Sequence, residues 1–353
     1  ASSASAAEDP RMKALVKVTP DRTEIQSVAV PECGPSDVLV RVRSAALCGT
    51  DLHILDWNAW AQGAGIQLPF ILGHECCGDV VAIGANVSGY NIGDKVVAET
   101  HIPCGTCYQC LNGEQHICKN LKIFGVHTHG CFAEYTIIPA VCARKIPENI
   151  THDVGSIMEP LGTAFRAALE TDVGGANVAV LGCGPIGLFA VTSASRLGAS
   201  LTIATDISPD RLTIARQIGA DIALNPNKDD ILRQVMESTN GIGVDVIIEA
   251  SGNIAAIKES FSFLRKGGTM AMIGLPGQPI EMELGREVVF KEAKIIGIHG
   301  RKMFETWTRM ERLLNAGKLN VNPVITHTMA LDDWQNGIHL AKSGQASKVV
   351  FHP

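Results

Sequence analysis

The order of apolar and polar positions changes in character near residue 150. Before that point, short alternating or apolar runs are separated by turns rich in Gly, Pro and Asn, a pattern typical of β-strands. The clearest runs are 38–43, 80–83 and 135–138. We therefore expect an irregular, β-barrel-like domain in the first part of the chain.

From about Asn177 onward, apolar runs typical of buried strands alternate with helical segments. The strands are expected at 178–181, 201–205, 244–249 and 270–273, with helices that begin at Pro185 and after Pro209. Such alternation indicates βαβ units, whose right-handed crossovers place helices on both faces of a parallel sheet. The predicted fold class is therefore α/β, with a doubly wound parallel sheet in addition to the β-rich domain.

The part of the chain after Gly300 is too short to fold alone. It is expected to carry a helix at 304–315, a short strand near Val324, a helix after Asp332 and a last strand at 348–351. We infer that it returns to complete the first domain. The expected division is 12–160 with 302–353 for one domain, and 161–301 for the other.

The composition fits a globular protein of two domains, because 46% of the 353 residues are hydrophobic and 19% are charged. The net charge is −6 without a basic stripe, so binding to nucleic acid or to a membrane surface is not expected. The stretch between Asp172 and Arg196 has no charged residue and is long enough to cross a bilayer. Its central Gly and Pro residues instead predict a strand, a turn and a helix.

Eleven cysteines, an odd number, argue against a disulfide framework and for a reducing compartment, which we expect to be the cytoplasm. No signal peptide is visible. Residues 1–11 (ASSASAAEDPR) are small and polar, and Met12 would open a credible native chain. We expect this first segment to be a remnant of cloning and leave it out of the predicted fold.

Four cysteines share one loop-rich segment with the spacing C-x2-C-x2-C-x7-C. They are Cys104, Cys107, Cys110 and Cys118. Four thiolates around one cation are typical of a structural zinc site, which has no open position for substrate and orders a segment with little core. An iron–sulfur cluster is the alternative, but such segments add their fourth cysteine three residues on, followed by proline. The gap of seven residues, followed by Lys119, favours zinc.

A glycine-rich turn, Gly182-Cys183-Gly184-Pro185-Ile186-Gly187, joins the strand at 178–181 to a predicted helix. Its glycines let the backbone approach a pyrophosphate, which the N–H groups and dipole of the helix N-terminus stabilise. The next strand ends on Asp206, roughly 20 residues further on, as a dinucleotide-binding motif requires. A carboxylate there accepts hydrogen bonds from the ribose hydroxyls and repels a 2′-phosphate, so we predict NAD rather than NADP. Arg211 is expected to flank the adenosine.

Further metal-ligating residue types lie earlier in the chain. Cys48 follows the alternating strand, and His74-Glu75 lies within the run GHECCG. The pattern GHE-x2-G-x5-G-x2-V from Gly73, followed by Gly93-Asp94-Lys95-Val96, is similar to the signature of zinc-containing medium-chain alcohol dehydrogenases. This resemblance extends over nearly the whole chain from Met12 onward. It implies a GroES-like catalytic domain and a Rossmann domain that binds NAD.

The resemblance implies a second, catalytic zinc. Cys48 and His74 would hold it, with Glu75 and Glu159 as carboxylate ligands or exchangeable near-ligands. Ordinary members of the family have a further Cys where this chain has Glu159, which could therefore coordinate zinc, hold a zinc-bound water, or act only on the helix dipole. A catalytic zinc has three protein ligands and one open position, at which a bound alcohol ionises easily.

Other roles also follow from the resemblance. Thr50 and His53 are implied to relay the proton of the alcohol to solvent, a task that suits imidazole because its pKa is near neutrality. The residues implied to line the nicotinamide half of the cofactor site are Ile186, Ile273, Gly274, Leu275, Ile298 and His299. Arg301 is expected to reach the pyrophosphate.

Within the family, three segments resemble the branch that degrades L-threonine: GCFAEY from Gly130, EPLG from Glu159 and GRKMFETW from Gly300. This implies oxidation of the threonine 3-hydroxyl by NAD to 2-amino-3-oxobutanoate in a homotetramer. Glu159 would face the ammonium, and His101 would contribute to threonine selection. A polyol or diol dehydrogenase, acting on sorbitol or 2,3-butanediol, is the alternative. A non-catalytic NAD- or zinc-binding protein is a more distant one.

Overall fold

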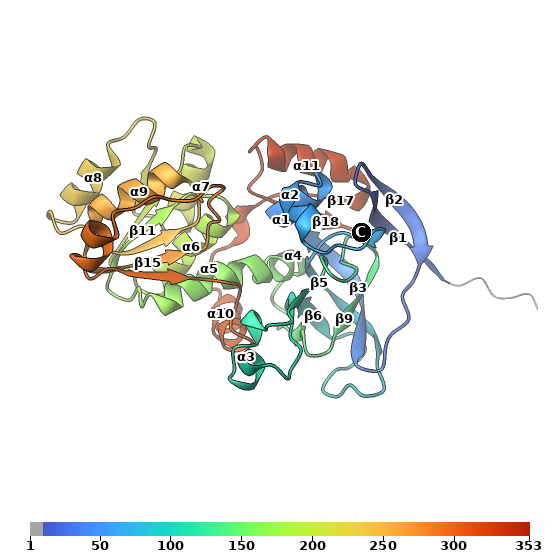
Figure 1. Ribbon diagram of the computed structural model, residues 1–353. Helices are drawn as coiled ribbons and strands as arrows, with labels where there is room; N and C mark the ends of the chain where they lie inside the picture. Colours follow the sequence, from blue (N-terminus) through green and yellow to red (C-terminus); the bar gives the residue numbers. More distant parts are fainter. Residues whose placement is uncertain (1–9) are drawn as a thin grey trace, which may run out of the picture. The chain divides into compact units, whose positions relative to one another are not determined.

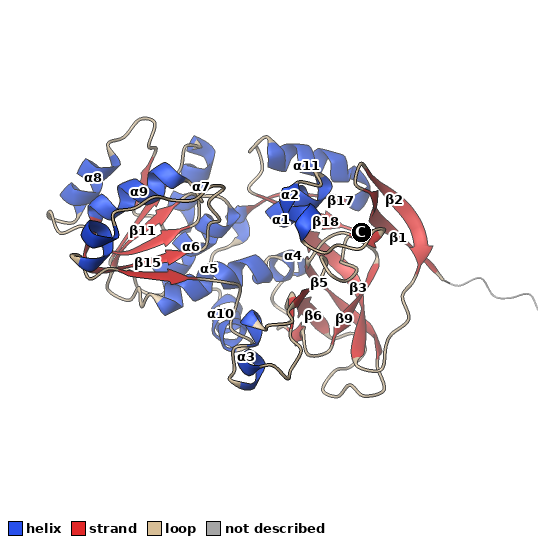
Figure 2. Ribbon diagram, in the orientation of Figure 1, coloured by secondary structure: helices blue, strands red, loops and turns tan. Residues whose placement is uncertain are grey.

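The structure is a computed structural model that describes residues 10–353, and these residues form two compact units (Figures 1 and 2). Unit 1 contains the described residues up to Tyr108, together with Cys118–Glu159 and His327–Pro353. Unit 2 contains Gln109–Ile117 and Pro160–Thr326. Nine residues of the segment attributed to cloning lie outside the described residues. Arg11, which also belongs to that segment, is already the first residue of strand β1.

Unit 1 is built on antiparallel strands (Figure 2). A small sheet has the order β2-β1-β4, and a larger one has the order β10-β6-β5-β3-β18-β17, with β9 also paired to β3. The bounds are β1 (Arg11–Thr19), β2 (Arg22–Ala29), β3 (Asp37–Ala46), β4 (Phe70–Ile71), β5 (Glu75–Ile83), β6 (Lys95–Ala98), β9 (Tyr135–Pro139), β10 (Ala143–Lys145), β17 (Ile325–Ala330) and β18 (Lys348–His352). The predicted β-rich first domain is thus confirmed.

The alternation seen in the sequence at 38–43 follows the two faces of β3. Val38, Val40 and Val42 are buried in the core, whereas Arg41 and Arg43 are exposed. Successive side chains of a strand point to opposite faces, so one face packs and the other meets water. Strand β3 pairs with β5, and Ala46 lies opposite Glu75. This pairing brings the residues that follow β3 close to those at the start of β5.

Unit 2 contains a parallel sheet of order β13-β12-β11-β14-β15-β16. The bounds are β11 (Asn177–Leu181), β12 (Leu201–Thr205), β13 (Ile222–Leu224), β14 (Val244–Glu249), β15 (Leu264–Met272) and β16 (Lys294–Gly297). The helices around it are α6 (Pro185–Arg196), α7 (Pro209–Ile218), α8 (Ile231–Ser238) and α9 (Ile254–Phe263) (Figure 1). This is the doubly wound sheet that the sequence predicts. Strand order reverses between β11 and β14, where such sheets bind ligands at their carboxyl edge.

The chain leaves unit 2 later than residue 302. Residues 302–326 group with unit 2, including helix α10 (Glu305–Asn315). Trp307 and Met310 of α10 are fully buried, and Arg301 lies so close to Gly162 of α5 (Met158–Glu170) that a Cβ there would collide with it. This packing of α10 beside α5 holds residues 302–326 in unit 2. The strand expected near Val324 begins one residue later, at the start of β17.

The remaining helices are short. They are α1 (Gly49–Leu55), α2 (Ala59–Gly63), α3 (Tyr108–Leu111), α4 (His152–Ser156) and α11 (Trp334–Lys342), and a two-stranded sheet joins β7 (His101–Ile102) to β8 (Lys122–Ile123). No helix within residues 10–353 is long and apolar enough to cross a membrane. The uncharged stretch between Asp172 and Arg196 divides into β11, a turn and α6, as expected.

Candidate functional site

Three predicted metal ligands of unit 1 lie together. Possible ligand atoms of Cys48, His74 and Glu75 are all within 4.8 Å of one another. Cys48 follows β3 and precedes helix α1, whereas His74 and Glu75 lie at the start of β5. The pairing of β3 with β5 therefore explains how residues distant in sequence form one cluster.

A buried acid that the sequence analysis did not single out completes this arrangement. Asp51 is fully buried in the first turn of α1, and its Oδ2 accepts a hydrogen bond of 2.9 Å from the Cys48 backbone N–H. Its Oδ1 lies 3.4 Å from Nδ1 of His74. A carboxylate facing one ring nitrogen is typical of a histidine that binds metal through the other. Burial alone would lower the pKa of His74, but the charges of Asp51 and Cys48 outweigh it and raise that pKa well above its usual value. The surroundings thus favour positive charge.

Glu75 is also bound to a buried cation. Nζ of Lys348, at the start of β18, lies 2.5 Å from Oε2 of Glu75 and donates a hydrogen bond of 2.9 Å to the Leu47 carbonyl. Lys348 is only 2% exposed. Burial alone would lower its pKa, but the Glu75 carboxylate and the Cys48 thiol outweigh burial and raise it. Glu75 would therefore divide its charge between this ammonium and a metal, which suits an exchangeable ligand.

Glu159 is near this cluster but is not part of the group that shares the 4.8 Å limit. It lies in the first turn of α5, and its Oε1 accepts a hydrogen bond of 2.8 Å from the Thr100 hydroxyl. Burial raises the pKa of Glu75, and the charge of Glu159 adds to that rise. The charge of Glu159 also adds to the larger effects of Glu75 and Cys48, which raise the pKa of Lys348 against the effect of burial. This position is compatible with a role beside a metal.

His101 is held by a neighbouring acid. Oε1 of Glu99 lies 2.7 Å from Nδ1 of His101 and also accepts a hydrogen bond of 2.9 Å from its backbone N–H. Both residues are buried. Glu99 thus fixes the orientation of the His101 ring. In the sequence, the only sign of this contact is an acid two residues before the histidine.

Thr50 and His53 lie one turn apart on helix α1. The Thr50 hydroxyl is 3.8 Å from the Cys48 sulfur, whereas His53 is exposed. The Asn58 amide lies 2.8 Å from Nδ1 of His53. A hydroxyl beside the cluster and an imidazole at the surface of the same helix suit a route for a proton.

The four cysteines of the C-x2-C-x2-C-x7-C segment also cluster, with sulfur atoms that lie within 4.8 Å of one another. The Cys107 and Cys118 sulfurs are 3.7 Å apart. A tetrahedron with Zn–S bonds of ~2.3 Å has edges of ~3.8 Å, so this separation fits zinc. Hydrogen bonds from the backbone and hydroxyl of Thr106, and from the Cys107 backbone, lower the pKa of Cys104 to about 5. A thiolate is the form that binds metal.

In unit 2, the glycine-rich turn follows β11 as predicted. Gly182 has φ +85°, and a Cβ on Gly187 would lie only 1.8 Å from the Gly182 carbonyl. Gly187 is therefore needed for the first turn of α6 to pack on the end of β11. Asp206 accepts hydrogen bonds from the backbone N–H groups of Cys183, at 2.7 Å, and Ser208, at 2.8 Å. It thereby joins the ends of β11 and β12.

A cavity of about 510 Å³ lies at this edge of the sheet. Gly182, Asp206, Arg211 and Ser251 are among the residues that line it. Nε of Arg211 is buried and has no hydrogen-bond partner among residues 10–353. The cavity volume is in the range of small-molecule and cofactor sites, and an unpaired guanidinium nitrogen in its wall suits a polar ligand.

The residues expected around the nicotinamide occupy three places in unit 2. Ile273 and Gly274 follow β15 and Ile298 and His299 follow β16, so both pairs lie at the carboxyl edge of the sheet. Ile186 is in the first turn of α6, and Leu275 is 89% exposed.

Arg301 is 1% exposed, donates a hydrogen bond to the Thr163 hydroxyl and lies 5.9 Å from the Trp307 ring. It is not among the residues that line the 510 Å³ cavity.

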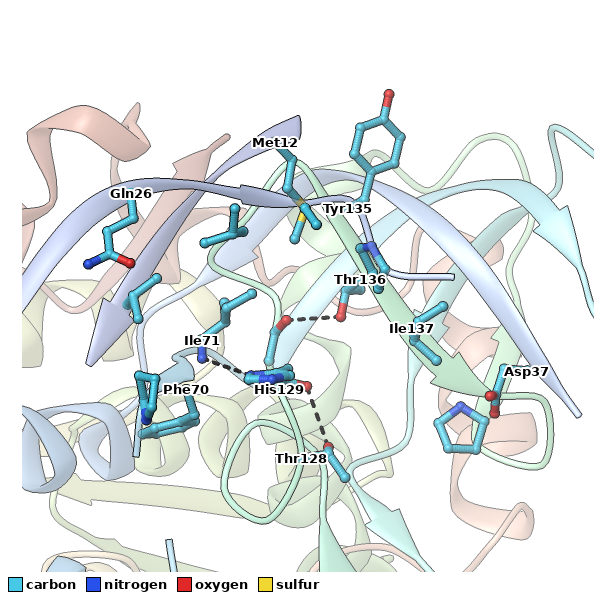
Figure 3. Close-up of a pocket in the computed structure, with 17 residues that line it drawn as sticks. Met12, Gln26, Asp37, Phe70, Ile71, Thr128, His129, Tyr135, Thr136 and Ile137 are labelled. Atoms are coloured by element: carbon cyan, nitrogen blue, oxygen red, sulfur yellow. Dashed lines mark hydrogen bonds between the residues drawn. The ribbon is translucent and has the colours of Figure 1, made fainter. Parts of the chain in front are cut away.

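A larger cavity, of about 570 Å³, contains none of the predicted site residues (Figure 3). Its lining is mostly apolar and comes from β1, β2, β4, β9 and the segment around His129. Nδ1 of His129 accepts a hydrogen bond of 3.2 Å from the Ile71 backbone, and Thr136 donates one to the Gly130 carbonyl (Figure 3). The volume of a cavity therefore does not identify the functional site of this protein.

Known proteins resemble this chain over nearly its full length. The alcohol dehydrogenase GroES-like domain matches residues 34–148, and the zinc-binding dehydrogenase family matches residues 185–316. L-threonine 3-dehydrogenase of Bacillus licheniformis is 42% identical over 98% of this chain and 100% of its own length. The chain belongs to the zinc-binding dehydrogenase family. L-threonine 3-dehydrogenase of Pyrococcus furiosus is 40% identical over 97% of this chain and 98% of its own length.

Solved structures of zinc-binding dehydrogenases and alcohol dehydrogenases share the fold. An alcohol dehydrogenase of Thermotoga maritima has a TM-score of 0.89 at 28% identity, over 98% of this chain and 100% of that one. A protein of Sinorhizobium meliloti, described as a zinc-binding dehydrogenase and bound to NADP, has a TM-score of 0.90 at 30% identity and the same coverage. An Escherichia coli alcohol dehydrogenase in complex with NADH has a TM-score of 0.89 at 26% identity, over 97% of this chain and 99% of that one.

Proposed function

We propose that this zinc-binding dehydrogenase oxidises the 3-hydroxyl of L-threonine with NAD, giving 2-amino-3-oxobutanoate and NADH. The observation that carries the proposal is the similarity, at 40–42% identity over about 97% of the chain, to several L-threonine 3-dehydrogenases. The cluster of Cys48, His74 and Glu75 supports it, because a non-catalytic relative has no need of these ligands. We assign the catalytic metal to unit 1 and the dinucleotide to unit 2.

Cys48 and His74 are the proposed firm ligands of a catalytic zinc, and Glu75 and Glu159 its exchangeable neighbours. When bound, such an ion supplies the positive charge that makes an alcohol hydroxyl acidic, and NAD accepts the hydride. Asp51 orients His74 for the metal, and Lys348 restrains Glu75. These contacts keep the ligand atoms together before any ion is bound.

Further residues outside the catalytic cluster divide the remaining tasks. Thr50 would take the hydroxyl proton, and the exposed ring of His53 would exchange it with solvent. The ribose of a bound cofactor would supply the link between the two residues. Glu159 faces the substrate ammonium, and its hydrogen bond from Thr100 holds it in place. His101, fixed by Glu99, contributes to selecting threonine. The Cys104, Cys107, Cys110 and Cys118 cluster binds a structural zinc.

The proposed cofactor site follows the carboxyl edge of the sheet in unit 2. A bound pyrophosphate would lie at Gly182, Gly184 and Gly187. The further contact expected from Arg301 is not supported, because its side chain is buried against Thr163 and Trp307 and does not line the cavity. Asp206 would accept hydrogen bonds from the ribose hydroxyls, and Arg211 would flank the adenosine. The nicotinamide would lie against Ile186, Ile273, Gly274, Leu275, Ile298 and His299. The relatives bound to NADP and to NADH have the same fold, so the choice of NAD depends on Asp206.

The substrate is tested by steady-state rates with NAD. We expect kcat/KM for L-threonine to exceed that for sorbitol and for 2,3-butanediol at least about tenfold. Only threonine has an ammonium and a carboxylate, so protein groups that bind these charges favour threonine over the two alcohols. A chelator should abolish all three rates. A threonine rate no better than the diol rate would replace the proposed substrate with a polyol or diol.

Metal analysis tests the two clusters. We expect two zinc ions per chain, with Cys48→Ala losing one ion together with activity, and Cys104→Ala losing the other together with thermal stability. Cys33 is outside both clusters, so Cys33→Ala serves as the control and should keep both ions. A single ion in the unmodified, zinc-supplied protein would contradict one of the two assignments.

Cofactor choice tests Asp206. In Asp206→Ala, the ratio of kcat/KM for NAD to that for NADP should fall about tenfold or more, because the carboxylate no longer binds the ribose hydroxyls or repels a 2′-phosphate. Asp210→Ala, an exposed acid in the first turn of α7, is the matched control and should leave the ratio unchanged. An unaltered preference in Asp206→Ala would refute its role.

We also propose that the protein is a cytoplasmic homotetramer. All eleven cysteines are free thiols, which suits a reducing compartment. In unit 2, β16 is an edge strand; its residue Ile295 is 42% exposed, and Phe290, which precedes the strand, is 78% exposed. Light scattering should give four times the chain mass, and Phe290→Glu should reduce it. A monomer in the unmodified protein would contradict the assembly.

A further inference from the structure

Strand β14 ends in a buried acid, Glu249. The metal and cofactor sites proposed above give this residue no role. The side chain is fully buried. Glu249 pairs with Leu181 of β11 on one side and with Met272 of β15 on the other, so it lies at the carboxyl edge where the strand order reverses. A carboxylate in such a place destabilises the fold unless it is hydrogen-bonded. The hydrogen bonds of the Glu249 carboxylate therefore indicate its role.

One carboxylate oxygen of Glu249 folds the turn that follows β14. Oε1 accepts hydrogen bonds from the Ser251 backbone at 2.8 Å, the Ser251 hydroxyl at 2.5 Å and the Gly252 backbone at 2.9 Å. The Ser251 hydroxyl oxygen in turn accepts one of 3.0 Å from the Asn253 backbone. Asn253 caps helix α9 by accepting from Ala256 N–H. Glu249 thus connects the end of the strand to the start of the helix.

This turn is packed against the glycine-rich turn. A Cβ on Gly182 would lie 2.8 Å from Cβ of Ser251, so the two turns are in direct contact. Ser251 and Asn253 line the same 510 Å³ cavity as Gly182 and Asp206. The position of Ser251 therefore sets the shape of the wall opposite Asp206.

The other oxygen faces a third turn. Oε2 of Glu249 has no hydrogen-bond partner among residues 10–353, and a Cβ on Gly274 would lie 2.4 Å from it. Only glycine leaves room for the carboxylate there. The Ile273 and Gly274 backbone N–H groups also donate to the Glu249 carbonyl, at 2.9 and 3.0 Å. One residue therefore contacts both of the turns that flank the end of β14.

We propose that Glu249 is a positioning residue for dinucleotide binding, an inference that rests on the cofactor site proposed above. Glu249 holds the Ser251 turn against Gly182 and keeps the Ile273–Gly274 turn in place, so that the cavity has its binding shape before the dinucleotide arrives. It does not touch the cofactor. A preformed site loses less conformational entropy on binding, and this difference appears as affinity.

The test is the Kd of NADH, measured by fluorescence titration on the full-length, zinc-loaded protein, with the Tm of each variant recorded alongside. Glu249→Ala should raise Kd about tenfold or more, because three donors of the turn lose their acceptor. Glu249→Gln should stay within about threefold, because an amide oxygen accepts the same bonds. KM for NAD should rise with Kd, whereas kcat at saturating NAD changes little.

The same strand supplies a matched control. Asp245, near the amino end of β14, accepts a hydrogen bond of 2.8 Å from the Asn177 backbone and pairs with Arg265. Asp245→Asn should lower Tm and leave the NADH Kd unchanged. If the role of Glu249 were merely structural, Glu249→Ala would give this same result.

A folded Glu249→Ala with wild-type Kd overturns the inference. If that variant does not fold, Ser251→Ala decides instead: a raised Kd supports the inference and an unchanged one overturns it. An unmodified protein that binds NADH without oxidising threonine refutes the proposed substrate and leaves this inference standing. One that binds only NADPH refutes the proposed cofactor choice, and the same Kd ratios are then measured with NADPH. Failure to bind either dinucleotide refutes both.

Discussion

Negative charge that is buried in unit 1 has to be balanced by positive charge, and the arrangement around Cys48, His74 and Glu75 depends on this requirement. Asp51 and Glu75 are both fully buried. One buried cation, Lys348, pairs with Glu75. Isolated buried charges are strongly unfavourable, so the remaining acid and thiol favour either a proton on His74 or a metal ion. The cluster therefore favours a bound cation, and its residues come from several distant segments of the chain.

Unit 2 uses acids in a different way. Asp206 and Glu249 each end a parallel strand, and each accepts hydrogen bonds from backbone N–H groups beyond the end of its strand. Backbone groups that leave a sheet lose their ladder partners, and a carboxylate can accept several of them at once. Two acids at the ends of β12 and β14, the strands on either side of β11, thus shape one cavity. Asp206 lines the cavity and is the proposed partner of the ribose, whereas Glu249 is buried and does not line the cavity.

Short-range patterns in the sequence predicted the elements and the clusters of side chains that depend on neighbouring residues. The alternation at 38–43, the cysteine spacing and the turn at Gly182 all depend on neighbouring residues, and the structure contains β3, the sulfur cluster and the β11–α6 turn. Lys348 could not be predicted in this way, because its contact with Glu75 spans 273 residues. The attachment of residues 302–326 to unit 2 likewise depends on burial of Trp307, which no local pattern reveals.

The pairing of Lys348 with Glu75 has a consequence for the order in which the molecule is made. Unit 1 begins with the first described residues and ends with His327–Pro353, and unit 2 is synthesised in between. Domains commonly start to fold during translation, from the N-terminal side. In a nascent chain, Glu75 and its neighbours therefore lack their ammonium until Lys348 has been synthesised, after the whole of unit 2. A chain that ended before Lys348 would contain all of unit 2, whereas the buried Glu75 of its incomplete unit 1 would lack its counter-charge.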